Sequence, residues 1–93
     1  MTETKQAFSK NVRVVNDLGL HARSAAKIAE IARSAVSRVW VQKDQERADA
    51  KDILDILTLA GEKGSNLTIV IDNDSDMDIL NHIVKLVQNG FGE

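Results

Sequence analysis

The chain has 93 residues, a formal net charge of −2 at pH 7, 43% hydrophobic residues and 3% aromatic residues. This length predicts one domain over residues 1–93 with a modest core, and the weakly acidic, aromatic-poor composition argues against nucleic-acid binding, which needs a basic face or stacking aromatics. Cysteine is absent, which excludes disulfide bonds and thiolate zinc sites.

The beginning of the chain, MTETKQAFSKN, has no hydrophobic signal core, and no apolar run is long enough to cross a bilayer. We therefore expect a cytoplasmic protein without membrane insertion. Residues 1–6 are expected to form a flexible N-terminal extension.

The first half of the chain predicts three strands and one helix. A strand over residues 7–15 leads through a loop of turn residues at 16–20. Small and branched apolar residues at helical spacing then predict an amphipathic helix over 22–34. A β-branched strand over 36–42 follows, and after a polar turn a short third strand lies near residues 47–50.

A second, short helix is predicted after these strands. Asp52 has the character of an N-cap, with Asp55 three residues later and an apolar run behind it. Gly61 or Gly64 is expected to end this helix. Residues 67–71 alternate weakly and are predicted to be the fourth strand.

A third helix is predicted from Ser75, which with Asp78 resembles a capping box, to its end at Asn89-Gly90. The order is therefore βαββαβα. Helices that interrupt the strands and share one apolar face predict an α+β fold, a two-layer sandwich with all three helices on one face of the sheet.

The segment Gly19-Leu20-His21-Ala22-Arg23-Ser24 places a histidine at the start of the first helix. Histidine is a poor N-cap on stability grounds. A helix start, however, offers unpaired N–H groups and the positive end of the dipole, so the imidazole of His21 would lie beside an anion site. Arg23 adds donors suited to phosphate. A histidine that transiently holds a phosphoryl group would need this arrangement; the alternative is an idle, exposed loop histidine.

From about Val12 to Val87 the chain resembles HPr, the histidine-containing phosphocarrier family of the bacterial phosphotransferase system (PTS). The resemblance rests on the segment Gly19–Arg23, on the small residues that follow it, and on a second segment, Lys51–Leu57. It implies the HPr-like open-faced sandwich, in which three helices cover one side of a four-stranded antiparallel sheet.

The resemblance also implies a function. His21 would accept a phosphoryl group on Nδ1 and Arg23 would stabilise the phosphate. The donor would be an enzyme I-type phosphohistidine protein and the acceptor an EIIA-type protein. The chain would be a monomeric, stoichiometric carrier and not an enzyme, without cofactor or metal. The alternative is a regulatory binding protein whose docking is switched by phosphorylation of His21, and the Gly90-Phe91 pair resembles the nitrogen-regulatory branch of the family, often called NPr.

Two positions beside His21 are further candidates for supporting the phosphate, Ala22 and Ser24. Many family members have proline where this chain has Ser24. The N–H and hydroxyl of Ser24 could donate to a phosphate or face water, and we expect them to face water.

By resemblance, partners would dock on an exposed apolar patch near His21. The residues that correspond to this patch are Leu20, Ala26, Ile53, Leu54 and Leu57. Asp52 stands where many members carry a serine that a regulatory kinase phosphorylates. Its carboxylate could shape docking, but we expect a helix cap, because aspartate is a strong N-cap that also suits the dipole.

Three other features of the sequence are alternative site candidates. The stretch Asp72–Asp78 resembles the start of an EF-hand loop but lacks its glycine and its bidentate glutamate, so we expect a solvated turn. His82 is expected near the surface of the last helix, because no second ligand lies at metal spacing. Trp40 is expected to pack in the core or on a sheet face.

Overall fold

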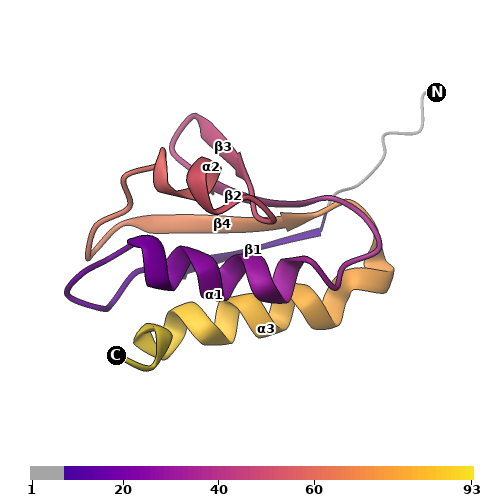
Figure 1. The fold of residues 1–93 in the computed structure, drawn as a ribbon. Coiled ribbons are helices and arrows are strands. Elements are labelled where there is room, and N and C mark those ends of the chain that lie inside the picture. Colours follow the sequence, from indigo (N-terminus) through magenta and orange to yellow (C-terminus); the bar gives the residue numbers. More distant parts are fainter. Residues whose placement is uncertain (1–7) are drawn as a thin grey trace.

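The computed structural model describes residues 8–93, so the expected extension at residues 1–6 lies outside the described residues. Strands and helices alternate in the predicted order, with two added 3₁₀ turns (Figure 1). The elements are β1 (Phe8–Arg13), α1 (Ala22–Ala32), β2 (Val39–Lys43), β3 (Glu46–Asp49), α2 (Ile53–Leu57), β4 (Asn66–Ile71), η1 (Asp74–Asp76), α3 (Met77–Gln88) and η2 (Gly90–Gly92).

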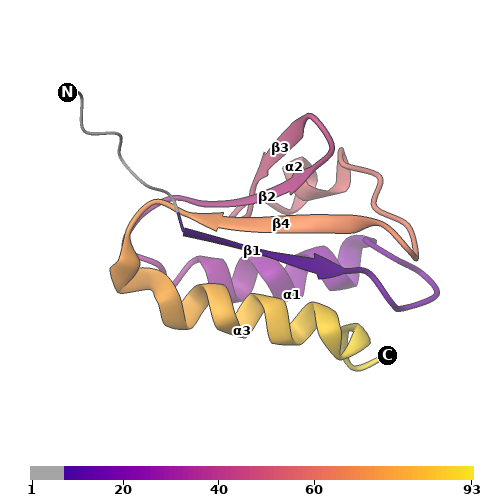
Figure 2. The ribbon, with the colours of Figure 1, turned by 180° about the vertical axis from the view of Figure 1, so that it is seen from behind.

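The four strands form one antiparallel sheet in the order β1-β4-β2-β3. In β1 and β4 the register runs from Phe8 opposite Ile71 to Arg13 opposite Asn66. Helices α1 and α3 run side by side along one face of this sheet, and α2 packs against α1 (Figures 1 and 2). The predicted α+β open-faced sandwich is confirmed.

The core lies between the sheet and the helices. Strand residues alternate, so that Val39 and Val41 of β2 and Ile69 of β4 are buried on the helix-facing side. Helix α1 contributes mainly small residues to this core, and α3, which lies close to β1 and β4, contributes larger ones. The buried helix residues are Ala25, Ile28, Ala29 and Ala32 of α1, and Leu80, Ile83, Val84 and Val87 of α3.

Trp40 lies on the opposite, open face of the sheet, where it is half-buried. The guanidinium carbons of Arg38 and Arg47 lie 5.8 Å and 5.2 Å from the centre of its ring. Of the two expected positions for Trp40, the structure shows the sheet face.

Helix α2 ends differently from the sequence-based expectation. Thr58 is its C-cap, and Ala60, with a φ of 51°, takes the left-handed conformation that follows. The prediction that Gly61 or Gly64 ends this helix is therefore wrong. An alanine in this conformation costs about 1–2 kcal/mol, which explains why sequence favoured the glycines.

Asp76 corrects the expectation of a solvated turn at residues 72–78. Only 3% of Asp76 is exposed, and it is the N-cap residue of α3, the position predicted for Ser75. Its carboxylate accepts hydrogen bonds from the backbone N–H groups of Val36 (2.9 Å) and Ser37 (2.9 Å), and from the Ser37 hydroxyl (2.6 Å). These bonds hold the α1–β2 connection in place, and β2 accordingly begins at Val39 and not at the predicted residue 36.

We predict that Asp76→Asn lowers the free energy of unfolding at pH 7 by about 1–3 kcal/mol, because a charged acceptor of three bonds is lost. Burial alone would raise the pKa of Asp76, but the hydrogen bonds from Ser37 and Val36 outweigh it and hold the pKa below its ordinary value of 3.8. The stabilisation is therefore present above pH 3.8 and is lost as the pH falls through the lowered pKa. Urea unfolding of both proteins across this pH range measures it.

Asp74→Asn is the matched control, because Asp74 is exposed in the adjacent 3₁₀ turn. Equal stability of wild type and Asp76→Asn at pH 7 would contradict the anchoring role.

Candidate functional site

The loop that precedes α1 is held by a close backbone approach. Gly19 has a φ of 64°, and a Cβ on it would clash with the carbonyl oxygen of Gly61 and lie 2.8 Å from the Cα of Glu62. Immediately beside this contact, the Leu20 N–H donates to the same Gly61 oxygen at 2.7 Å. Only glycine at position 19 allows both, so the loop is fixed against the segment that follows α2.

His21 is the N-cap residue of α1, as predicted, with extended backbone angles of −134° and −179°. Its carbonyl accepts the first helical bond, from the Ala25 N–H at 2.8 Å. Its imidazole is 28% exposed. The histidine thus lies at the helix start with its ring accessible, where the first N–H groups lack helical partners.

Ser24 caps the backbone of His21. Its hydroxyl accepts from the His21 N–H at 2.9 Å and lies 3.0 Å from the Gly19 carbonyl oxygen, to which it donates. The side chain is fully buried, so the expectation that it faces water is wrong. The hydroxyl is occupied by the cap, because the surrounding carbonyl and amide groups use both its donor and acceptor capacity.

Glu93 is the site residue that sequence reasoning missed. One oxygen of its carboxylate contacts Nε2 of His21, and the other accepts from the Asn16 amide nitrogen at 3.0 Å. The hydrogen bond from Asn16, and next the one from His21, hold the pKa of Glu93 below its ordinary value of 4.5. A separation of 72 residues from His21 left no local pattern by which to find this contact.

The two cationic side chains near His21 differ in their hydrogen bonding. Arg23 is exposed in the first turn of α1, and among residues 8–93 its side chain has no hydrogen bond or ion pair. Lys27, one turn later, donates to the carbonyl oxygen of Phe91 at 2.7 Å. Arg23 is therefore a cation at the start of α1 that is not engaged with any other described residue.

The predicted apolar patch is accessible. Leu54 is 75% exposed, and the other predicted members, Leu20, Ala26, Ile53 and Leu57, are half-buried. Leu18 and Val15 in the loop before His21 are also exposed, at 70% and 45%, and were not predicted. Asp52 caps α2 as expected, since its carboxylate accepts from the Asp55 N–H at 3.2 Å.

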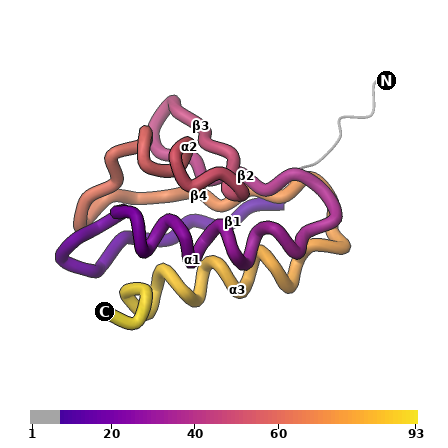
Figure 3. The backbone as a smooth tube through the Cα atoms, viewed as in Figure 1, coloured from indigo at the N-terminus to yellow at the C-terminus, as the bar shows by residue number. Residues whose placement is uncertain are grey.

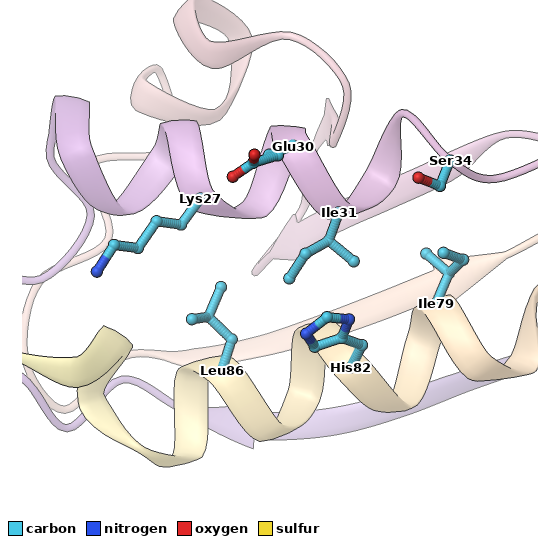
Figure 4. Close-up of a pocket in the computed structure, with 7 residues that line it drawn as sticks. All are labelled: Lys27, Glu30, Ile31, Ser34, Ile79, His82 and Leu86. Atoms are coloured by element: carbon cyan, nitrogen blue, oxygen red, sulfur yellow. The ribbon is translucent and has the colours of Figure 1, made fainter.

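A groove lies away from His21, between α1 and α3 (Figure 4). It has a volume of about 470 Å³, and Ile31, Ile79 and Leu86 line it together with the polar side chains of Glu30 and His82. None of the predicted site residues lines it. In the part of the chain that the structure describes, there is no cluster of three metal-ligand side chains, and no helix is long and apolar enough to cross a membrane.

Comparison with known proteins places most of the chain in one family. The family described as "PTS HPr component phosphorylation site" matches residues 8–89. The phosphocarrier protein HPr of Cupriavidus necator is 33% identical over 86 residues, which are 92% of this chain and 97% of that protein. The phosphoryl donor subunit DhaM of a PEP-dependent dihydroxyacetone kinase from Providencia stuartii is 30% identical over 97% of this chain, but only 19% of DhaM is covered.

A solved structure has the same fold. The crystal structure of HPr-C-His from Thermoanaerobacter tengcongensis superposes with a TM-score of 0.86 at 30% identity, covering 92% of this chain and 97% of that one.

We predict that Gly19→Ala is more destabilising than Gly64→Ala by more than about 1 kcal/mol. Both glycines have positive φ, at 64° and 93°, so both substitutions carry the strain of a left-handed alanine. A Cβ at position 64 meets nothing within 4 Å, whereas one at position 19 meets backbone. Denaturant unfolding measures the loss of unfolding free energy in each variant, and the difference between the two losses reports the close approach at Gly19. Equal losses would show that this approach does not contribute to stability.

Proposed function

Because this chain belongs to the HPr family of phosphocarrier proteins of the phosphotransferase system, we propose that His21 accepts a phosphoryl group from an enzyme I-type protein and passes it to an EIIA-type protein. The acceptor atom is Nδ1. The observation that carries the proposal is the position of His21 itself, an accessible imidazole at the start of α1. A cytoplasmic location and a monomeric state belong to the same proposal.

The transfer is a displacement between two nitrogens. The lone pair of His21 Nδ1 forms a new N–P bond as the N–P bond of the donor phosphohistidine breaks, and the donor nitrogen keeps that electron pair. The transition state is loose, with charge spread over the phosphoryl oxygens. A shallow, accessible site suits this step, because two proteins must bring their histidines into line.

Two groups of donors face the charge that develops. The N–H groups of the first turn, those of Ala22 and Arg23 among them, lack helical partners and point out of the helix start. The Arg23 guanidinium adds a fixed positive charge and a fork of donors for phosphate oxygens. Donors arranged in advance stabilise the transition state more than the ground state, so they speed transfer.

Partner docking is assigned to the apolar patch of Leu20, Ala26, Ile53, Leu54 and Leu57. A small patch suits partners that must leave quickly, because a large interface would slow release. Asp52 lies at the edge of this patch, so its carboxylate would act chiefly on association rate and its dependence on salt. Its position at the start of α2 is fully accounted for by capping.

A regulatory role is the second candidate. The Gly90-Phe91 pair resembles the regulatory branch of the family, in which docking switched by phosphorylation of His21 would control a target. The chemistry at His21 is the same in both cases, and only the acceptor differs.

We predict that incubation with phosphoenolpyruvate and an enzyme I-type protein adds one acid-labile phosphate to the wild-type chain, and that His21→Ala abolishes this gain without loss of the fold. His21 lies outside the buried core, so the substitution removes no packing. Intact-protein mass and circular dichroism measure the two effects. The matched control is His82→Ala on α3. Phosphate that still arrives on His21→Ala would refute the assignment.

We predict that Arg23→Ala slows phosphoryl transfer at least about tenfold, the loss expected when a preorganised donor to the transition state is removed from an exposed site. Stability should change little, because a cation in the first turn is opposed by the helix dipole. Arg33→Ala is the control, since Arg33 is an exposed arginine at the other end of α1. Rapid-quench experiments measure the transfer rates of both variants. Equal slowing would mean that the rate depends on the net charge of the protein and not on the position of Arg23.

A further inference from the structure

The chain makes an unusual turn after α3. Gly90, Phe91 and Gly92 all have positive φ, at 64°, 60° and 76°. A bulky residue such as phenylalanine rarely adopts this conformation, and residues held in it often mark functional sites. The Phe91 side chain is 1% exposed, so burial of the aromatic ring compensates for the strained backbone.

The turn brings Glu93 to the loop before α1, from the opposite end of the chain (Figure 3). Two side chains hold it there. Lys27 donates to the Phe91 carbonyl oxygen at 2.7 Å, and Asn16 donates to one oxygen of Glu93 at 3.0 Å. Asn16 is 6% exposed and also donates to the Gly19 carbonyl at 2.9 Å, so it links Glu93 directly to the pinned loop.

The remaining oxygen of Glu93 contacts Nε2 of His21. The Glu93 side chain is 23% exposed, and its pKa is lowered, first by the hydrogen bond from Asn16 and then by that from His21. It is therefore a carboxylate at neutral pH. A carboxylate only accepts hydrogen bonds, so in the neutral imidazole Nε2 carries the proton and Nδ1 carries the free lone pair.

We propose that Glu93 is a positioning residue for phosphoryl transfer, which holds the imidazole of His21 in the Nε2–H tautomer and stabilises the charge that the ring gains when Nδ1 bonds phosphorus. The proposal rests on the phosphocarrier function above. Nδ1 supplies the electron pair of the new N–P bond, the donor nitrogen keeps the pair of the broken one, and the proton on Nε2 stays in place. The ring then carries positive charge opposite the carboxylate, as in other carboxylate–histidine pairs.

This role differs from that of Arg23. Arg23 faces the phosphoryl oxygens, whereas Glu93 acts through the far nitrogen of the ring and never touches the phosphate. Loss of Glu93 should therefore lower the rate of transfer within the docked pair and leave docking unchanged.

The test is Glu93→Gln, which keeps the size of the side chain but removes its charge. Because an amide can both donate and accept, it no longer favours one tautomer of the His21 ring. Glu30→Gln is the matched control, an exposed glutamate on α1 outside these contacts. Ring ¹⁵N shifts of His21 in the unphosphorylated proteins should show only the Nε2–H form in wild type and control, and both neutral forms in Glu93→Gln. Transfer from an enzyme I-type donor should show kcat about tenfold lower, equivalent to about 1.4 kcal/mol, with KM unchanged.

Two results would overturn the proposal. One is an unchanged His21 ring spectrum together with an unchanged kcat in Glu93→Gln. The other is a rise in KM alone, which would make Glu93 a docking contact. Failure of the wild-type protein to accept phosphate would refute the phosphocarrier function instead, and the ring spectra would still report whether Glu93 fixes the tautomer.

Discussion

The contact between Gly19 and Gly61 is the constraint on which the site depends. The Leu20 N–H reaches the Gly61 oxygen only because position 19 has no Cβ. Together with the backbone bonds between Val14 and residues Gly64 and Ser65, this approach joins two segments, the loop that carries His21 and the segment that follows α2. In the proposed function, this contact anchors His21 relative to the patch residues of α2, and a docking partner would have to match that arrangement.

Capping and chemistry are divided between two residues at the start of α1. In most helices the N-cap side chain satisfies the backbone, and a histidine in that position is a poor choice. Here the buried hydroxyl of Ser24 accepts from the His21 N–H, and the His21 side chain faces the Ser24 N–H in the reciprocal half of a capping box. The two ring nitrogens therefore have different surroundings, with Nε2 facing Glu93 and Nδ1 left as the acceptor in the proposed transfer.

Sequence reasoning recovered what depends on local pattern. Hydrophobic periodicity and the resemblance gave the element order and the sheet-covering helices, and the segment around His21 gave the helix start. Sequence reasoning failed where a polar side chain is hydrogen-bonded by residues that are far away in the sequence. Asp76 looked like one of several solvated acids, but 40 residues away it meets the amide of Val36. Glu93 was not recognised because its contact with His21 spans 72 residues, and Ser24 was expected to face water because its burial is decided only when α1 packs in the fold.

The central claim is that the pinned helix start presents Nδ1 of His21 as the phosphoryl acceptor. It is tested most directly by ¹⁵N–³¹P coupling in the phosphorylated protein labelled with ¹⁵N at the histidine rings. The account predicts a one-bond coupling from phosphorus to Nδ1 of His21, with Nε2 still protonated. Coupling to Nε2 of His21, or to either nitrogen of His82, would contradict it.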